Sequence, residues 1–422
     1  MVFERGFIVK NRPTGDLQYV QQMNRRLVLD TLLNHGPMSK IEISRATTLS
    51  PTTVGNAIIE LQAENLVHEV GKVASPLGRR PTLLDIQWNS RSVIGLAIID
   101  NKVIGVRTNI AAVVQKVSIK KFELSGNIIA VLTAIVDELM EGLGDTSVLG
   151  IGLATPGILN RKDGEIETIA NYPWKHLKFP GDVLHHRSLP WVIENDTNAA
   201  ALGEAYFGRG RGVQSFCYVH VGTGIGAGII VDHHIFLGSH GNAGEVGHIT
   251  VETKGKKCRC GNVGCLEAHV SWQEVMSLLR DHLPQEMWVD DFETIVDRAG
   301  YLRSIYHKGM VSEALVDIAD MLAVGISSLV SITDPSLVIV EGIFNQCSEF
   351  MNVLQEYTNR RLINLSHGAP LVTTGELSEF ASVAGIIVVL LEKYGFLKSP
   401  ESLLTAPYQF KMPVVIEEIE AK

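Results

Sequence analysis

The stretch Gly244–Glu267 reads GEVGHITVETKGKKCRCGNVGCLE and places one histidine and three cysteines close together in a chain that has five cysteines in all. One imidazole and three thiolates form closed tetrahedral sites of the kind that hold structural zinc. The loop is short and rich in glycine, so without a metal it has little reason to hold one conformation. We therefore expect a Zn²⁺ site here, with free thiols beside an unrelated histidine as the alternative. The expected ligands are His248, Cys258, Cys260 and Cys265.

A second glycine-rich segment lies upstream of the cysteines. Gly222–Gly228 reads GTGIGAG and separates two apolar runs that we expect to be strands, Phe216–Val221 and Ile229–Val231. Glycines at this density let backbone N–H groups approach phosphates, and they can equally form a tight hairpin. The segment by itself does not distinguish these two interpretations.

Two polar residues precede a predicted alanine-rich helix. In Glu194–Ala200, which reads ENDTNAA, an apolar strand ends at Asn195 and Asp196. An amide and a carboxylate at such a strand end can bind ligand hydroxyls in a cleft, and in a kinase Asp196 could accept the proton of an attacking hydroxyl. The alternative is that they only cap the helix. Glu267, two residues after the last cysteine, would be turned toward the same cleft by the cysteine loop.

Beyond residue 90 the chain alternates strand-like apolar runs with helical stretches. Such alternation indicates a mixed α/β body, and we expect two lobes with a ligand cleft between them. The expected first lobe is 86–197 with 376–396, and the expected second lobe, 198–375, carries the cysteine loop. Besides 216–221, the predicted strands are Val93–Ile99, Val148–Leu153, Trp191–Glu194 and Leu337–Val340.

Residues 1–85 predict a separate winged helix-turn-helix. Apolar residues at helical spacing predict a first helix over Tyr19–Asn34. Ser39 and Glu42 have the spacing of a capping box, which opens a second helix that ends at Ala46.

A third helix and a wing complete this predicted head. Ser50 followed by Pro51 is a typical helix start. Strands over Leu66–Val70 and Pro81–Ile86 would form the wing. The apolar stripe of the third helix should pack on the first two helices and consists of Val54, Ala57, Ile58 and Leu61.

The third helix carries short polar side chains that suit a DNA major groove, and the wing carries two adjacent arginines that suit a narrow minor groove. We expect the head to contact DNA through both. The alternative is a protein-interaction module with solvated loop charges. The expected DNA-binding residues are Ser50, Thr52, Thr53, Asn56, Arg79 and Arg80.

Composition limits where and how the protein works. The chain has 422 residues, is 45% hydrophobic, and can bury two or three cores. The N-terminus lacks a signal pattern, and the longest apolar run, Val383–Leu391, is too short to cross a bilayer. We expect a soluble, cytoplasmic protein without membrane insertion. Residues 1–85 carry 10 Lys and Arg against 8 Asp and Glu in a chain with a net charge of −9, which confines any DNA contact to the head.

Together these segments resemble the ROK family of repressors, sugar kinases and uncharacterised relatives, over nearly the whole chain. The winged head is similar to that of the NagC/XylR-like repressor branch. The resemblance implies a two-lobed, actin-like or ribonuclease H-like sugar-kinase fold behind the head. The segments that match the family's signatures are Ala154–Gly157, Glu194–Asp196, Gly222–Gly228, Gly244–His248 and the cysteine loop that ends at Glu267.

The resemblance also implies roles for individual residues. Zinc would lie on the four ligands named above. One ring nitrogen of His248 would bind the metal while the other faces a sugar hydroxyl, so the metal would orient a ligand-binding group. The implied sugar-binding residues are Asn195, Asp196, Glu245, His248 and Glu267, with Asn171 of the segment Asn171–Trp174 as a further contact.

One departure from the family pattern bears on catalysis. ROK kinases have a first-lobe strand that ends in Asp and a Gly-Gly-Thr turn, which accommodates ATP phosphates. Here Ala97 stands in place of that Asp, and Ile98-Ile99-Asp100 replaces the glycines. Glu341 replaces the first glycine of a later pair that ends at Gly342. The comparison implies a body that binds sugar without kinase activity.

We therefore expect a sugar-responsive repressor that binds a roughly palindromic operator as a homodimer or tetramer. Closure of the lobes on the sugar would alter the spacing of the heads. Two rival hypotheses remain: an active ATP-dependent sugar kinase with a DNA-binding head, and a repressor controlled by a protein partner such as a sugar-transport component. The sequence leaves open the identity of the sugar and whether it releases or promotes DNA binding.

Overall fold

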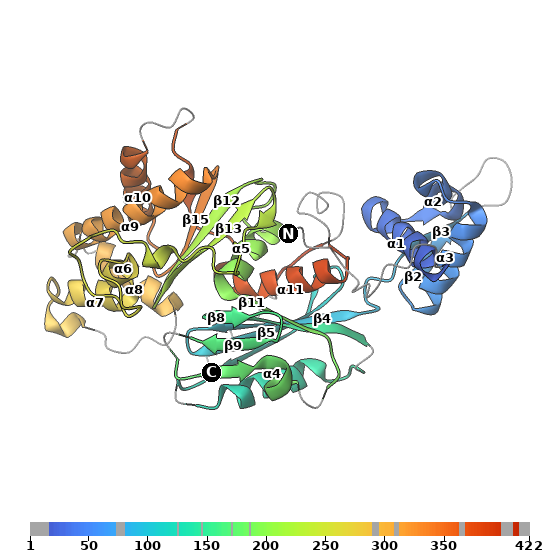
Figure 1. The fold of residues 1–422 in the computed structure, drawn as a ribbon, viewed down its shortest axis with the longest axis horizontal. Coiled ribbons are helices and arrows are strands. Elements are labelled where there is room, and N and C mark those ends of the chain that lie inside the picture. The colour runs from blue at the N-terminus through green and yellow to red at the C-terminus, as the bar shows by residue number, and fades with distance from the viewer. Residues whose placement is uncertain are drawn as a thin grey trace.

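The structure is a computed structural model that describes residues 17–72, 81–124, 126–144, 147–169, 172–184, 187–288, 295–307, 312–362, 368–397 and 408–412. These residues form a small N-terminal head and a two-lobed body (Figure 1). Arg79, Arg80 and Asn171 lie outside the described residues, so their expected roles stay predictions.

The head is a winged helix-turn-helix, as the sequence predicted. The Ser39–Glu42 capping box is present in both directions, and the Ser50 side chain accepts a hydrogen bond from the Thr53 N–H. One short strand was not predicted, Met38–Ser39, which pairs with the second wing strand. The elements are α1 (Leu17–His35), β1 (Met38–Ser39), α2 (Lys40–Thr47), α3 (Pro51–Ala63), β2 (Val67–Lys72) and β3 (Thr82–Ile86).

The core of the head uses only one side of α1. The predicted stripe of α3 is buried, and so are Val28 and Leu32 of α1. By contrast, Met23 and Leu27, which repeat at the same helical spacing, are 56% and 42% exposed. The periodicity thus predicted the helix correctly, but it did not reveal which face of that helix α2, α3 and the wing cover.

The first lobe is a five-stranded sheet in the order β11-β7-β4-β5-β6. Strands β4, β7 and β11 run parallel to one another, β5 runs antiparallel to β4, and β6 runs antiparallel to β5. Helix α4 (Ile128–Met140) lies on one face and α11 (Ala381–Lys393) on the other (Figure 1). A three-stranded sheet of β8, β9 and β10 adjoins it. The strands are β4 (Ser92–Ile99), β5 (Lys102–Asn109), β6 (Val114–Lys121), β7 (Val148–Thr155), β8 (Ile158–Asn160), β9 (Glu165–Thr168), β10 (Lys175–Lys178) and β11 (Trp191–Asn195).

The second lobe is a five-stranded sheet in the order β14-β13-β12-β15-β16, covered by helices. Its strands are β12 (Phe216–Val221), β13 (Ile225–Val231), β14 (His234–Ile235), β15 (Leu337–Gly342) and β16 (Leu371–Thr373). Its helices are α6 (Glu267–Val270), α7 (Trp272–Arg280), α8 (Ile295–His307), α9 (Ser312–Thr333) and α10 (Ser348–Arg361).

The glycine-rich segment forms the β12–β13 hairpin, which was one of its two interpretations. Its turn is closed by a hydrogen bond from the Gly222 N–H to the Gly224 carbonyl. Strand β13 begins at Ile225, earlier than predicted, so Gly226 and Gly228 lie within it. A Cβ on Gly228 would come within 2.5 Å of the Ala201 Cβ. The missing side chain therefore lets α5 (Asp196–Phe207) pack directly on the strand.

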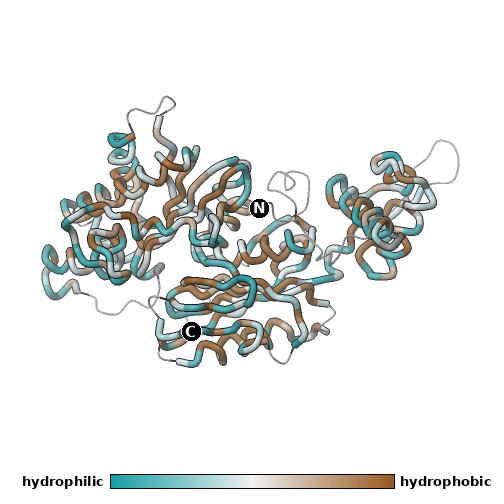
Figure 2. Tube along the Cα trace, in the orientation of Figure 1, coloured by the Kyte–Doolittle hydropathy of each residue, from teal (hydrophilic) through white to brown (hydrophobic). Residues whose placement is uncertain are grey.

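Helices α5 and α11 cross between the two lobes at very short range (Figure 1). A Cβ on Gly385 of α11 would lie 1.6 Å from the Ala199 carbonyl oxygen, and a Cβ on Gly203 of α5 would lie 2.2 Å from the Ala381 carbonyl oxygen. Helix α11 is apolar along most of its length (Figure 2). The glycines and this apolar surface let each lobe contribute one helix to a shared, tightly packed crossing.

Among the described residues, α9 is the single helix long and apolar enough to cross a bilayer. Buried positions such as Leu315, Leu322 and Ile326 belong to the core of the second lobe. Core helices of globular proteins pass the same length and hydropathy test, so this helix gives no separate indication of a membrane span.

We expect Gly385→Ala to destabilise the body by at least about 3 kcal/mol, because the new methyl group meets backbone atoms of α5 that have no room to move. Thermal and urea unfolding would measure the loss. Gly55→Ala in α3 is the matched control, because a Cβ there meets no atom within 4 Å. Unfolding of Gly385→Ala at the wild-type temperature would contradict the close crossing.

Candidate functional site

A cleft of about 590 Å³ lies between the lobes. This volume falls within the range of small-molecule sites. The first lobe and α5 contribute Asn195 and Asp196, and the second lobe contributes the other candidates. All five described residues that were expected to bind sugar line this one cleft: Asn195, Asp196, Glu245, His248 and Glu267.

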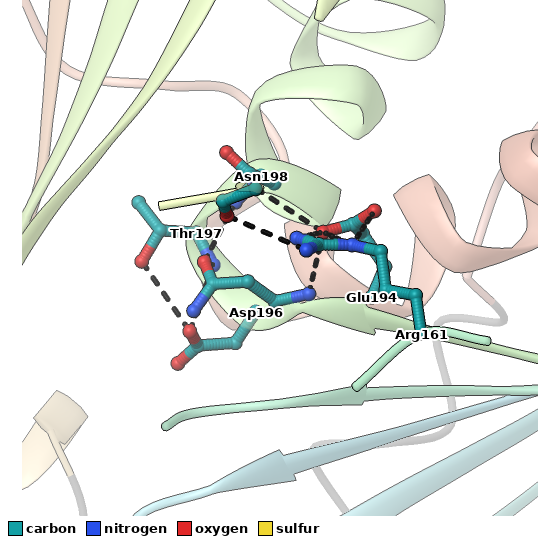
Figure 3. Close-up of polar contacts among 7 residues, drawn as sticks. Arg161, Glu194, Asp196, Thr197 and Asn198 are labelled. Carbon is teal, nitrogen blue, oxygen red and sulfur yellow. Dashed lines mark hydrogen bonds and ion pairs between the residues drawn. The ribbon is translucent and has the colours of Figure 1, made fainter. Parts of the chain in front are cut away.

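Asn195 and Asp196 stand where β11 runs into α5 (Figure 3). The Asn195 Oδ1 accepts hydrogen bonds from the N–H groups of Thr197 and Asn198, at 3.0 and 3.2 Å. The Asp196 Oδ1 accepts one from the Thr197 N–H at 2.9 Å. Helix capping and cleft lining, which the sequence left as alternatives, are therefore combined in the same two residues.

The carboxylates of the cleft influence one another. Desolvation raises the pKa of Asp196, and the nearby charge of His220 opposes that rise. Desolvation also raises the pKa of Glu245, with His248 opposing it and the charges of Glu267 and Asp196 adding to it. An ionised carboxylate accepts hydrogen bonds but cannot donate them. The cleft thus presents acceptors to a ligand and repels further negative charge.

The four expected metal ligands meet beside the cleft. One donor atom from each of His248, Cys258, Cys260 and Cys265 lies within 4.8 Å of the others. The His248 Nδ1 is 3.8 Å from the Cys258 Sγ, and the Cys260 and Cys265 sulfurs are 3.7 Å apart. Sulfurs around a tetrahedral zinc, with bonds of about 2.3 Å, are about 3.8 Å apart. The donor set and its spacing therefore fit a tetrahedral metal ion.

The cysteine loop connects the metal ligands to the cleft. His248 ends a single 3₁₀ turn, Val246–His248, and its Nε2 lies 4.0 Å from a carboxylate oxygen of Glu245. Glu267 opens α6 two residues after Cys265, and its Oε2 accepts a hydrogen bond from the Ile225 N–H at 3.1 Å. Two of the expected ligand-binding side chains are thus fixed by the loop that gathers the thiols.

The turn between β4 and β5 also borders the cleft. Ile98, Ile99 and Asp100 line it, whereas Ala97 is fully buried in the core cluster that contains α11. Asp100 lies 3.4 Å from the Arg298 guanidinium of the second lobe. The expected loss of the phosphate-binding turn after Ala97 therefore stays a prediction. The adjoining Ile98-Ile99-Asp100 side chains border the cleft.

Glu341 also lines the cleft and is buried. Its carboxylate accepts hydrogen bonds from the Gly375 N–H at 2.7 Å and from the Asn345 side chain at 2.9 Å. Burial raises the pKa of Glu341. A carboxylate held in this way occupies space that a glycine would leave open.

Arg161 is a residue of the cleft that the sequence analysis missed (Figure 3). Its Nε lies 3.1 and 3.0 Å from the two carboxylate oxygens of Glu194, which is only 6% exposed. Glu194 in turn accepts hydrogen bonds from the Asn195 N–H and the Asn198 side chain. On the other side, a Cβ on Gly241 of the second lobe would lie 2.3 Å from the Arg161 Nη1. The buried Glu194 was the available signal, since such a charge requires a partner.

The third helix of the head presents its polar residues to solvent. Ser50, Thr52 and Asn56 are exposed, and Thr53 is half-buried. The Ser50 and Thr53 hydroxyls lie 2.8 Å apart, so these two side chains serve the helix cap as well as the surface. Of the four residues, Ser50 and Thr53 are thus the two whose side chains also take part in the hydrogen bonds of the helix cap.

Comparison with known proteins agrees with this architecture. A xylose repressor of Caldicellulosiruptor bescii is 30% identical over 390 residues, which cover 89% of this chain and 97% of the relative. The xylose repressor of Bacillus subtilis is 25% identical over 385 residues, covering 90% and 98%. The dual regulator NagC of Escherichia coli is 26% identical over 356 residues, covering 78% and 82%.

Solved structures share the fold. A ROK family transcriptional regulator, a homologue of the Escherichia coli MLC protein, superposes with a TM-score of 0.72 at 22% identity over 92% of this chain and 99% of that one. A glucokinase of Streptomyces griseus, in complex with glucose and AMPPNP, gives 0.62 at 24% identity over 71% and 98%. The ROK family model matches residues 103–393. With a family match over most of the body and repressor relatives over nearly its full length, this chain belongs to the ROK family.

Proposed function

We infer that this protein is a sugar-responsive transcriptional repressor. The observation that carries this function is the union, in one chain, of a winged helix-turn-helix head and a cleft where five polar side chains able to bind hydroxyls meet. The relatives named above, which are xylose repressors and NagC, support it. The head would contact operator DNA through Ser50, Thr52, Thr53 and Asn56, with Arg79 and Arg80 in the minor groove.

In this proposal the cleft binds a neutral sugar. Asp196, Glu245 and Glu267 would accept hydrogen bonds from sugar hydroxyls, while Asn195 and His248 would supply further polar contacts. Asn171 remains a predicted contact. Closing the two lobes around the sugar would exclude water and strengthen each of these hydrogen bonds. DNA affinity would change because the sugar binds the closed arrangement better than the open one.

A zinc ion would be held by His248, Cys258, Cys260 and Cys265. When bound, the metal supplies a cross-link and fixes the orientation of the His248 ring, with no open position for catalysis. The fit rests on the sulfur spacing and the closed donor set. The chain's own contribution is to bring Glu245 and Glu267 to the cleft from either end of the cysteine loop.

We propose that the body lacks kinase activity. Three further acidic residues, Asp100, Glu341 and Glu379, line the cleft. Lys102 lies 2.5 Å from Glu379, and Asp100 lies beside Arg298, so these two cations already have partners. Phosphates would meet anionic side chains with little free positive charge. The protein would act in the cytoplasm, as a homodimer or tetramer on operator DNA.

A gel-shift titration tests the function directly. The duplex would be selected from a random pool by the protein itself, and D-xylose, D-glucose and N-acetyl-D-glucosamine would be added in turn. We expect one sugar to change DNA affinity at least about tenfold, or about 1.4 kcal/mol, and to raise the melting temperature. Asp196→Asn should lose the sugar response but keep DNA binding, whereas Asn56→Ala should weaken DNA binding by about 1–3 kcal/mol and keep sugar binding.

Two outcomes would contradict this function. DNA affinity that no sugar changes would remove the sensor role. Release of ADP at enzymatic rates with any of these sugars would establish the rival kinase activity instead. Retention of the protein by a membrane fraction, without a sugar-induced thermal shift, would favour control by a protein partner.

Removal of one thiolate tests the metal site. We expect Cys258→Ser to abolish stoichiometric zinc, measured by mass spectrometry, and to lower the melting temperature by about 2–4 °C for each kcal/mol lost. Sugar affinity should fall as well, because Glu245 and Glu267 lose their support. Cys347→Ser, at a buried cysteine outside the cluster, is the control and should retain zinc. Equal zinc content in both variants would refute the assignment.

Substitution of Arg161 tests whether its contact with Glu194 maintains the shape of the cleft. Arg161→Lys keeps the charge but not the two-point contact with Glu194, and we expect sugar affinity to fall about tenfold by calorimetry. The pair Arg161→Gln with Glu194→Gln should bind sugar better than Arg161→Gln alone, because no unpaired charge is left buried. Lys162→Gln, at an exposed neighbouring position, should leave affinity unchanged. No rescue by the double variant would rule out a positioning role.

A further inference from the structure

Arg26 of the head is bound to the end of α11. Its Nη1 donates a hydrogen bond to the Tyr394 carbonyl at 3.2 Å, and its Nη2 donates one to the Gly395 carbonyl. Within the head, the same guanidinium lies 2.7 Å from Asp30, one turn further along α1. A single side chain thus joins the DNA-reading head to the helix that crosses between the lobes.

The backbone at Gly395 leaves room for the Arg26 side chain. Gly395 has a φ of +71°, and a Cβ there would lie 2.2 to 2.4 Å from three atoms of the Arg26 guanidinium. Tyr408 lies against the same place: its hydroxyl donates to the Phe396 carbonyl, and its ring meets Trp88 edge-on at 5.7 Å. Burial raises the pKa of Tyr408, and the nearby charge of Arg26 opposes that rise. We call Arg26, Gly395 and Tyr408 the head joint.

The other end of α11 reaches the proposed sugar site. Ser382, in its first turn, donates a hydrogen bond to the Asp196 backbone carbonyl at 3.0 Å. Ser382 also lines the cleft. The helix has 13 residues, so it spans about 20 Å between the cleft and the head joint.

Helix α11 is held too tightly to slide independently of α5. Gly385 and Gly203 bring the two backbones into direct contact. The buried Glu204 of α5 also accepts hydrogen bonds from the N–H groups of Glu376 and Leu377, just before α11. A displacement of the α5 N-terminus, where Asn195 and Asp196 lie, must therefore be taken up by α11 as a rigid body.

We propose that Arg26 is the positioning residue that transmits the sugar state of the cleft to the head, through α11 and the head joint. This inference rests on the proposed function and specifies its regulation. When the lobes rearrange around a sugar, the Tyr394 and Gly395 carbonyls move with α11, and Arg26 carries the head with them. Without Arg26, sugar binding and DNA binding persist as two separate equilibria with reduced coupling.

The test uses two adjacent arginines of α1. Arg26→Gln removes the contact with the body, whereas Arg25→Gln removes the same charge from a residue whose partner, Glu64 at 2.6 Å, lies within the head. Each full-length variant is titrated on the selected duplex with and without the active sugar of the panel above. Sugar affinity is measured separately by calorimetry. Arg26→Lys and Gly395→Ala provide independent disturbances of the same contact.

We expect wild type and Arg25→Gln to show the same sugar-induced change in DNA affinity. In Arg26→Gln and Gly395→Ala this change should fall at least threefold, and in Arg26→Lys by an intermediate factor. The sugar Kd of the Arg26 variants should stay within twofold of wild type, which separates loss of coupling from damage to the cleft. An undiminished sugar response in Arg26→Gln would disprove the coupling role of the head joint and leave the proposed function intact. A wild type without any sugar response would overturn the proposed function and, with it, the joint.

Discussion

The contact between α5 and α11 at Gly203 and Gly385 is the constraint on which the rest of the body depends. Each helix belongs to a different lobe, and backbone touches backbone where they cross. Such packing leaves no flexible side chain to absorb a displacement, so α5 and α11 move together, and any rearrangement of the lobes must pivot about their crossing. The cleft lies at one end of this crossing, and the head is attached at the end of α11.

The cysteine loop plays a complementary part on the second lobe. It brings His248 against the thiols and, at the same time, places Glu245 and Glu267 at the cleft. Stability of the loop and shape of the cleft are therefore properties of the same residues. At the β4–β5 turn, Asp100 and Lys102 contact groups beyond their own sheet.

Local chemistry allowed much of this to be predicted from the sequence. The Ser39–Glu42 box and the Ser50-Pro51 start are short-range signals, and both helices begin where they indicated. The cluster that could hold a metal was also recognisable, because three thiols and an imidazole at short spacing have few other uses. The ROK resemblance supplied the two-lobed fold, which the family match and the shared folds confirm.

What the sequence did not predict depends on contacts between distant segments. Arg161 and Arg26 look like ordinary surface arginines until the fold places them beside Glu194 and Gly395. The exposed Met23 and Leu27 carry the same periodicity as the buried Val28, so spacing alone could not assign the covered face. The burial of Ala97 was not predictable from its own position either, because alternate residues of β4 face opposite sides of the sheet. The expected domain boundaries and the assembly state remain predictions.

The carboxylates that line the cleft also determine which ligands the cleft favours. A neutral polyol brings only hydroxyl donors and meets Asp196, Glu245 and Glu267 at no electrostatic cost. A phosphate ester of the same polyol would bring up to two negative charges beside these carboxylates, and like charges at short range disfavour binding. In the proposed sugar site, these carboxylates would favour a neutral polyol over its phosphate ester, whatever the stereochemistry of the polyol.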